Sequence, residues 1–216
     1  MEYYAATLRE PGKKLNNDGL MIKGIRKREN QDTVVMVLSS DKKDAKLNDR
    51  IIRAAEKMVY KAQRKECHRA LEQQLHKLFC GFGGGRLLFI KKWPDIMVIV
   101  INGMNYHIMN NGENRVVKVD RFDAEEIVCE KVSSVKGALK RGGFCYIKGS
   151  LHEGSTIIAA TPSFFERQLR SDIHKRLCPQ MCIDSETMQE NIEALKELLK
   201  GRGEERPVTA CALCMK

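Results

Sequence analysis

The sequence predicts a layered α+β sandwich, in which helices cover the outer faces of antiparallel sheets. Three observations support this fold class. Apolar, β-branched runs recur along the chain, for example at residues 33–38 and 155–160. Segments with apolar residues at helical spacing stand between these runs and after them. Tight-turn sequences such as Asn102-Gly103 join neighbouring extended runs, which is typical of antiparallel pairing.

The chain has 216 residues and 43% hydrophobic content, which is enough for one sizeable core. We therefore expect a single domain over residues 20–216. Residues 1–19 mix charged residues with Pro11 and Gly12, and they predict an irregular N-terminal segment or an edge segment. The sequence shows no apolar run of membrane-spanning length and no signal-peptide pattern, so we expect a cytoplasmic protein without a membrane association.

In the first half of the chain, strands are expected at residues 20–25 and 33–38, and the second is apolar on both faces. Residues 47–79 contain neither Gly nor Pro and repeat apolar residues at helical spacing, which predicts one long helix or two in succession. The glycine-rich residues 81–85 should end this helix before the next strand.

A β meander should follow, with tight turns at residues 102–103 and 110–112. Its strands are expected at residues 87–90, 96–101, 106–109 and 115–119.

The last third of the chain predicts two more helices between strands. Strands are expected at residues 144–148, 155–160 and 208–215. Thr161 and Pro162 suit the start of one helix, whose buried stripe should be Phe165, Leu169, Ile173 and Leu177. The other should span residues 185–200, with Gly201 as its stop.

The eight cysteines lie mostly in apolar segments, so we expect reduced, buried thiols. Two close pairs, Cys178 with Cys182 and Cys211 with Cys214, have spacings that zinc sites use. An odd separation within a strand directs Cys211 and Cys214 to opposite faces, which argues against a four-thiolate site.

The formal net charge of +10 admits nucleic acid, an anionic membrane or an acidic protein as partner. The basic residues are spread along the chain, and only residues 23–28 are dense. The aromatic content of 6% shows no stacking motif for bases, so nucleic-acid binding is the third hypothesis.

Four segments of the chain match the motifs of one protein family in order and spacing. The first is residues 24–32, Gly-Ile-Arg-Lys-Arg-Glu-Asn-Gln-Asp. The others are residues 99–112, which read as a strand, turn, strand and hairpin, residues 154–165, an apolar strand before a helix, and residues 205–210 before the last strand. Together they resemble the type 2C metal-dependent Ser/Thr protein phosphatase family, and residues 24–32 are similar to its opening motif. The resemblance implies a layered α/β/β/α sandwich of two antiparallel sheets flanked by helices.

The family's motif suggests roles for residues near the first strands. The aspartate that corresponds to Asp32 belongs to the family's acidic metal centre, and an arginine five residues earlier binds the substrate phosphate. Lys27 holds that position here, between Arg26 and Arg28. The resemblance therefore implies that Arg26, Lys27 and Arg28 bind phosphate, through charge-assisted hydrogen bonds.

Other family carboxylates have no clear counterpart. A pair of Mg or Mn ions needs several oxygen ligands with negative charge. The family's Asp-Gly turn after the strand at residues 33–38 is absent, and only Asp41 could substitute for its aspartate. The Gly-Asp-Ser turn reads Asn102-Gly103-Met104.

The two C-terminal aspartates of the metal centre are also replaced. One position is taken by Thr161 or Pro162, and neither carries a negative charge. The other is taken by Arg206, unless a shift of one residue brings in Glu205.

We therefore expect a pseudophosphatase, a catalytically inactive signalling module that binds a protein or phosphoprotein partner and needs no cofactor. The alternative is an active, divergent phosphatase that uses Mn or Mg held by Asp32, Asp41 and Glu205.

Overall fold

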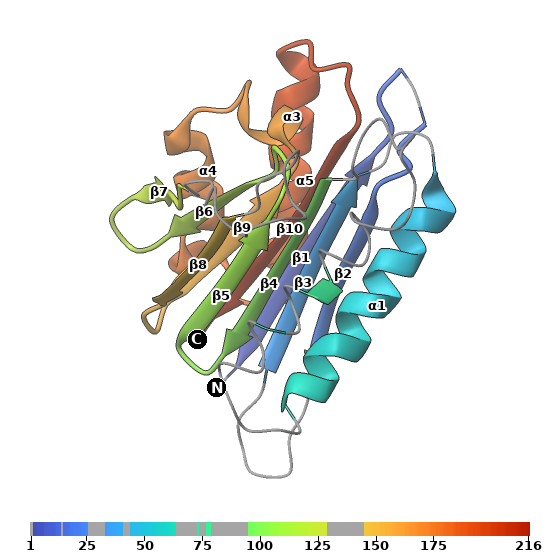
Figure 1. The fold of residues 1–216 in the computed structure, drawn as a ribbon. Coiled ribbons are helices and arrows are strands. Elements are labelled where there is room, and N and C mark those ends of the chain that lie inside the picture. The colour runs from blue at the N-terminus through green and yellow to red at the C-terminus, as the bar shows by residue number, and fades with distance from the viewer. Residues whose placement is uncertain are drawn as a thin grey trace. The chain divides into compact units, whose positions relative to one another are not determined.

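A computed structural model describes residues 2–13, 15–25, 33–40, 44–63, 73, 77–78, 95–128 and 145–216. They form an α+β structure with two five-stranded sheets (Figure 1). The predicted α+β class is confirmed. The chain divides into two compact units, each containing one sheet. The first consists of Met1–Asn16, Asn114–Val128 and Ser150–Lys216, and the second of Asn17–Glu113 and Cys129–Gly149.

The sheet of the first unit has the strand order β1-β10-β9-β6-β7. Its strands are β1 (Tyr3–Glu10), β6 (Arg115–Val119), β7 (Ala124–Glu126), β9 (Ser155–Ala160) and β10 (Val208–Met215). Its helices are α3 (Pro162–Phe165), α4 (Arg170–Leu177) and α5 (Ser185–Gly201), with the 3-10 helix η1 (Pro179–Met181) between the last two. The pairings of β1 with β10, β10 with β9, β9 with β6 and β6 with β7 are all antiparallel.

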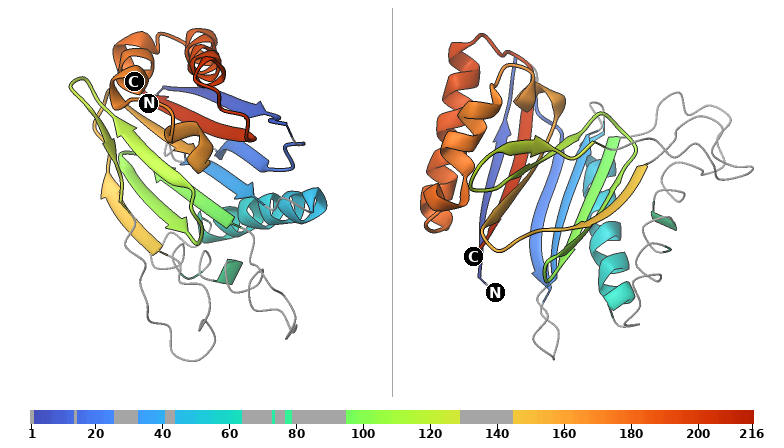
Figure 2. Two further views of the ribbon diagram at one scale, coloured as in Figure 1. Left: turned by 90° about the horizontal axis from the view of Figure 1, so that it is seen from above. Right: turned by 90° about the vertical axis from the view of Figure 1, so that its left-hand side faces the viewer.

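The core of the first unit lies between this sheet and α4 and α5, which cover one of its faces (Figure 2). Alternate residues of β10, namely Ala210, Ala212 and Cys214, belong to this core. The α5 side chains Met188, Ile192, Leu195 and Leu199 pack against them, as the helical spacing predicts. All eight residues of β10 are buried, so both faces of this interior strand are covered.

The sheet of the second unit has the order β2-β3-β4-β5-β8. Its strands are β2 (Gly19–Ile25), β3 (Thr33–Ser40), β4 (Asp95–Asn102), β5 (Asn105–Asn110) and β8 (Cys145–Ser150). The helix α1 (Ala45–Gln63) packs on it through Ile51, Ala55 and Val59, which share a core with Val35 and Val37 of β3.

Most predicted elements occur where the sequence places them. The strands expected at 20–25, 33–38, 96–101, 106–109, 115–119, 144–148, 155–160 and 208–215 are β2, β3, β4, β5, β6, β8, β9 and β10. The helix expected at 185–200 is α5, and the one expected from residue 47 begins as α1. The glycine-rich residues 81–85 and the strand expected at 87–90 lie outside the described residues.

Of the two alternatives predicted for residues 1–19, an irregular segment or an edge segment, the edge segment is confirmed for Tyr3–Glu10. β1 pairs with β10 from Tyr3↔Met215 to Glu10↔Val208, at the edge of the sheet. Only Ala6 and Leu8 of this strand are buried. An edge strand with two buried side chains gives a weak alternation signal, so its charged residues dominate the pattern. The single domain predicted over residues 20–216 stays a prediction.

The predicted meander is wrong after β5. The turn at residues 102–103 does join β4 to β5, and Gly103 has a φ of +56°. After residues 110–112, however, β6 pairs with β7 and β9 in the other sheet. Gly112 is required for a close approach, since a Cβ atom there would lie 2.5 Å from Asp95 Cβ.

The single helix expected after Thr161 is wrong as well, because two helices stand there. Asp172 Oδ2 accepts a hydrogen bond from the backbone N–H of Leu169 at 3.0 Å, and this contact starts α4 anew. Leu169 is consequently exposed rather than part of a buried stripe.

Four thiols are free as expected, those of Cys178, Cys182, Cys211 and Cys214. Cys145 is disulfide-bonded, which corrects the prediction of reduced thiols at that position. Cysteine spacing carries no information on which thiols meet in the fold.

No helix among the described residues is long and apolar enough to cross a membrane.

Candidate functional site

The structure describes only part of the predicted site. Arg26, Lys27, Arg28, Asp32 and Asp41 lie outside the described residues, so their predicted roles stay predictions. Glu205, Arg206, Thr161 and Pro162 lie in the first unit.

The two C-terminal segments of the resemblance meet where β9 ends and β10 begins. Thr161 N donates to Thr209 O at 2.9 Å, and Thr209 N donates to Thr161 Oγ1 at 3.1 Å. Ser163 Oγ donates to Pro207 O at 2.7 Å. The sequence places these segments far apart, and the pairing of β9 with β10 brings them together.

Thr161 is the N-cap residue of α3 and Pro162 is its first residue, as predicted, but the Thr161 side chain bonds to the start of β10 instead of to the helix. Its side chain makes no capping hydrogen bond to α3. The hydroxyl instead accepts from Thr209 N and lies 3.0 Å from Ser163 Oγ. Thr161 is buried, so these contacts satisfy a polar group that water does not reach.

The C-terminus of α5 positions an acidic residue that the sequence analysis did not single out. Gly203 N donates to Lys200 O at 2.9 Å, and Glu204 N donates to Leu199 O at 3.0 Å. This pair of bonds is a Schellman motif with Gly203 in the left-handed region, at a φ of +75°. The helix thus ends at Gly201, and the glycine that terminates it is Gly203 rather than the expected Gly201. The turn presents Glu204 toward the start of β10.

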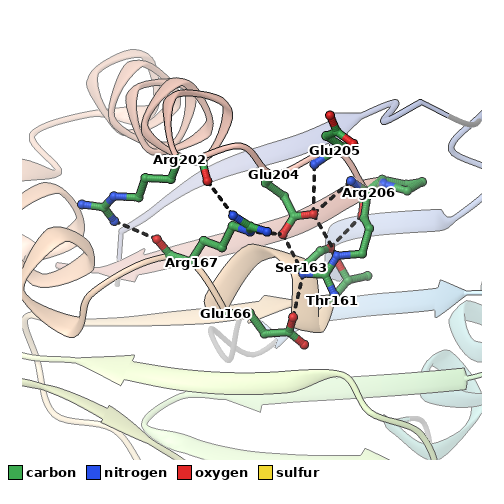
Figure 3. A network of polar contacts seen from close by, with 9 residues as sticks. Thr161, Ser163, Glu166, Arg167, Arg202, Glu204, Glu205 and Arg206 are labelled. Atoms are coloured by element: carbon green, nitrogen blue, oxygen red, sulfur yellow. Dashed lines mark hydrogen bonds and ion pairs between the residues drawn. The ribbon is translucent and has the colours of Figure 1, made fainter.

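Glu204, Arg206 and Glu166 form an ion-pair cluster (Figure 3). Arg206 Nε lies 2.8 Å from Glu204 Oε1, and its Nη2 lies 2.6 Å from Glu204 Oε2. The same Nη2 lies 2.6 Å from Glu166 Oε2. The Glu204 side chain is only 3% exposed, so the bidentate arginine neutralises a nearly buried carboxylate.

Arg167 and Arg202 extend the cluster toward α4 (Figure 3). Arg167 Nη1 donates to Arg202 O at 2.6 Å, and Arg202 Nη1 donates to Arg167 O at 2.8 Å. Arg167 Nε lies 3.6 Å from Glu204 Oε2, and Arg202 Nη1 lies 2.7 Å from Asp172 Oδ2. We call Glu166, Arg167, Arg202, Glu204 and Arg206 the arginine–glutamate cluster.

The ion pairs hold these groups in their charged forms. Hydrogen bonds from Arg206 lower the pKa of Glu204 from 4.5 to about 2. The same contact, with that of Glu166, raises the pKa of Arg206. The hydrogen bond from Arg202 lowers the pKa of Asp172 below its ordinary value.

Glu205, the predicted alternative ligand, is paired with a lysine. Its carboxylate lies 2.5 Å from Lys13 Nζ, and both side chains are exposed. Its backbone oxygen accepts from Lys13 N at 2.8 Å. Gly12 allows this approach, because a Cβ atom there would lie 2.1 Å from Glu205 O. The structure thus directs Glu205 toward the N-terminal segment.

The described part of this site does not fit a pair of divalent metal ions. Thr161 offers a neutral hydroxyl that already has partners, and Arg206 contributes a fixed positive charge. The carboxylates of Glu166 and Glu204 face guanidinium groups. Among residues 95–128, 145–216 and the shorter described ranges, no group of three His, Cys, Asp or Glu side chains could hold a metal ion.

Sequence reasoning missed Glu204 and Glu166 because it compared single positions with the family motif. A signal was present, since Glu204 stands two residues before Arg206 in the sequence. Only the left-handed turn at Gly203 shows that the two side chains meet.

No family model matches the chain, and no curated protein matches it. Solved bacterial phosphatase structures do resemble it closely in fold. The serine/threonine phosphatase PstP/Ppp of Mycobacterium tuberculosis superposes with a TM-score of 0.70 at 11% identity, over 100% of both chains. The serine/threonine phosphatase of S. agalactiae gives a TM-score of 0.66 at 12% identity, again over 100% of both chains.

A third structure is PppA, described as a key regulatory component of T6SS in Pseudomonas aeruginosa. It has a TM-score of 0.67 and 13% identity, over 99% of this chain and 97% of that one. The chain therefore has the phosphatase 2C fold, as the sequence predicts. Identities this low show the fold alone.

Proposed function

We propose that this chain is a phosphatase-like binding module that recognises a protein or phosphoprotein partner and does not hydrolyse phosphate. The fold supports this proposal, since it matches bacterial Ser/Thr phosphatases over their whole length. The replaced metal ligands argue against catalysis.

The single observation that carries the proposal is the position of Arg206. It stands where the resemblance expects a metal-binding aspartate, and its guanidinium binds Glu166 and Glu204. A divalent cation brought to this point would meet a positive charge in place of a ligand. It would also have to displace the guanidinium that already binds both carboxylates, and it would lose hydration water in doing so.

The predicted ligand side of the module is basic. Arg26, Lys27 and Arg28 supply donors suited to a phosphate group, and the net charge of +10 favours an anionic partner. We propose that these residues hold a phosphoserine or phosphothreonine segment, in the cytoplasm. This role is independent of the arginine–glutamate cluster, whose three positive and two negative charges are balanced by the carboxylate of Asp172.

Phosphate release tests the absence of catalysis. The full chain should release no phosphate from p-nitrophenyl phosphate or a phosphoprotein above the rate without enzyme, with Mn or Mg present. The Asp32→Ala variant should behave like the wild type. Metal-dependent turnover that Asp32→Ala abolishes would instead establish the active alternative, in which Asp32, Asp41 and Glu205 hold the metal.

Peptide binding tests the proposed recognition of a phosphorylated partner. A phosphoserine peptide and its unphosphorylated twin are titrated against the chain by fluorescence anisotropy. We expect the phosphorylated peptide to bind more tightly, and Lys27→Ala to reduce that difference. The Arg170→Ala variant removes an exposed arginine elsewhere and serves as the control for net charge. Equal affinity for both peptides would contradict phosphate recognition, and an oligonucleotide that binds more tightly would favour the nucleic-acid hypothesis.

A further inference from the structure

The helix α1 carries a row of basic side chains on its solvent-facing side. Its opposite side is buried and packs on the sheet of the second unit. The exposed basic residues follow one another at intervals of three or four residues, and they are Lys46, Arg50, Arg53, Lys57 and Lys61. We call these residues the basic row. Because residues at this spacing share one face of a helix, the basic row is a nearly straight line about 22 Å long, with one positive charge per turn.

The charges of the basic row are not neutralised within the part of the chain that the structure describes. None of its members makes an ion pair with a described carboxylate. Glu56, in the same helix, pairs with Lys23 of β2 instead. Asp49 is the one exposed carboxylate within residues 46–61, all of which are described. The exposed side of α1 therefore keeps a surplus of positive charge.

The helix α5 shows how the same chain neutralises cations elsewhere. Lys196 pairs with Glu193, and Lys200 Nζ lies 2.8 Å from Glu10 Oε1. In α1, by contrast, successive members of the basic row repel one another, since like charges three or four residues apart destabilise a helix. Its first turn contains no acidic residue, and Lys46 there opposes the helix dipole. The basic row thus lowers the stability of the helix, which indicates a role in binding rather than in folding.

Contacts on the buried side hold α1 in a fixed orientation. Ser39 Oγ donates to Asn48 Oδ1 at 2.7 Å, and Asn48 Nδ2 donates to Asn17 O at 2.6 Å. Gly19 lets β2 approach the helix closely, because a Cβ atom there would lie 2.7 Å from Ile52 Cδ1. The basic row is therefore presented by an ordered helix, and a partner that binds it does not have to order the backbone first.

The spacing of the charges favours a helical partner over a nucleic acid. A cation once per turn recurs about every 5.4 Å, and carboxylates placed once per turn on another α-helix have the same interval. One strand of duplex DNA advances only about 3.4 Å per phosphate, so its charges fall out of step with the row. Single-stranded nucleic acid stacks on several aromatic side chains, whereas Tyr60 is the only aromatic residue of α1.

A membrane surface fits α1 less well than a protein. Interfacial helices bury an apolar face in the lipid, whereas the apolar face of α1 belongs to the core of the second unit. The exposed side offers only charged side chains and Tyr60 for contact with a partner. A protein surface with ordered carboxylates complements such a side directly.

We propose that the basic row is a docking surface for an acidic helix of a partner protein. The partner helix carries Asp or Glu once per turn and lies along α1. Arg50 and Arg53, near the middle of the basic row, each bind a carboxylate through two nitrogen atoms. The contact is exposed and polar, so its affinity is modest and falls with salt. This surface does not depend on the proposed phosphate-binding role of residues 26–28.

Binding of two synthetic peptides to the full chain tests the proposal. Both are fluorescein-labelled, alanine-based helices of identical composition. One carries a glutamate once per turn along one face, and the other distributes the same glutamates around the helix. In anisotropy titrations at low ionic strength, the aligned peptide should bind at least about threefold more tightly than the scrambled one, and added salt should remove the difference.

Paired charge reversals locate the binding surface. The double variant Arg50→Glu/Arg53→Glu should weaken binding of the aligned peptide about tenfold or more, because two attractions become repulsions. The new carboxylates stand four residues from Lys46 and Lys57, so the helix should stay folded, and circular dichroism checks this. The matched control is Arg170→Glu/Lys175→Glu, which makes the same change in net charge at two exposed positions of α4. It should change the Kd less than about twofold.

Three results would overturn the proposal. Equal affinity for the aligned and scrambled peptides would show that the alignment of the charges has no effect. An equal loss in both double variants would reduce the interaction to net charge. The third is a single-stranded oligonucleotide or a phosphatidylserine vesicle that binds more tightly than the aligned peptide and loses this affinity in Arg50→Glu/Arg53→Glu. That result would assign the basic row to nucleic acid or to lipid instead of a protein helix.

Discussion

Arg206 binds the carboxylate of Glu204 through two nitrogen atoms, with Nε 2.8 Å from Oε1 and Nη2 2.6 Å from Oε2. The bidentate geometry fixes the guanidinium at the start of β10, and Glu166 binds the same Nη2 from α3's C-terminal end. A positive charge is thereby held where the resemblance expects a metal-binding carboxylate. This relationship supports the inactive binding module, and it leads to tests on the folded chain.

Replacing Arg206 by Ala should destabilise the protein. It leaves the nearly buried Glu204 carboxylate without its two charged hydrogen bonds. Because the Arg206 side chain is half exposed, solvent screens the pair, and we expect a loss of about 1–2 kcal/mol in the free energy of unfolding. Urea unfolding followed by circular dichroism measures it. The control Arg170→Ala should stay within about 0.5 kcal/mol of the wild type, and an equal loss in both variants would contradict the prediction.

Stability should depend on the ionisation of Glu204 at acidic pH. The pKa of this carboxyl falls from 4.5 to about 2 on folding, so its contribution is present above pH ~4.5 and disappears as the pH falls toward 2. The Glu204→Gln variant cannot ionise, and its stability should fall less steeply across that window. Unfolding free energies at several pH values from 2 to about 6 measure the difference between the two curves. Parallel curves would show that the cluster does not hold Glu204 ionised.

Thr161 should act through its hydroxyl rather than its size. In Thr161→Val the backbone N–H of Thr209 loses its acceptor Oγ1 in a buried setting. We expect a cost of about 1–3 kcal/mol in unfolding free energy. Thr161→Ser keeps the hydroxyl and removes one methyl group, so it should cost only about 1 kcal/mol. A valine variant as stable as the serine variant would mean that the hydroxyl is not needed.

Replacing each of two glycines near the end of α5 by alanine should change the stability of the protein in opposite directions. Gly203 has a φ of +75°, so Gly203→Ala should cost about 1–2 kcal/mol. Gly201 lies in the helix with open space around its Cα, so Gly201→Ala should stabilise by about 0.5–1 kcal/mol. The Tm values of the two variants and the wild type, measured by thermal unfolding, test both expectations. A rise in Tm for Gly203→Ala would refute the Schellman turn that presents Glu204.

The sequence predicts the central elements well because their signals are local. β9 and β10 are continuous apolar runs, and α5 has a regular buried stripe. The strand β1 is hard to predict from its own residues, because it is defined by its pairing with β10, more than 190 residues away in the chain. The course of the chain after Asn110 depends in the same way on distant pairing. The residues around β6 do not indicate that this strand pairs with β9 in the other sheet.

For the candidate site, the sequence predicts only which metal-binding carboxylates of the family are replaced. The resemblance indicates that Thr161 and Arg206 stand in place of carboxylates, and the structure shows what each does instead. Glu166 and Glu204 could not be assigned from sequence, because their encounter with Arg206 depends on the turn at Gly203 and on the end of α3.

Calorimetric titration of the full chain with Mn most directly tests whether the metal centre has been lost. We expect no pair of sites with micromolar affinity, and no change in this result for Asp32→Ala. Two such sites in the wild type, both lost on substitution of Asp32, would contradict the inactive module and establish a metal-dependent phosphatase.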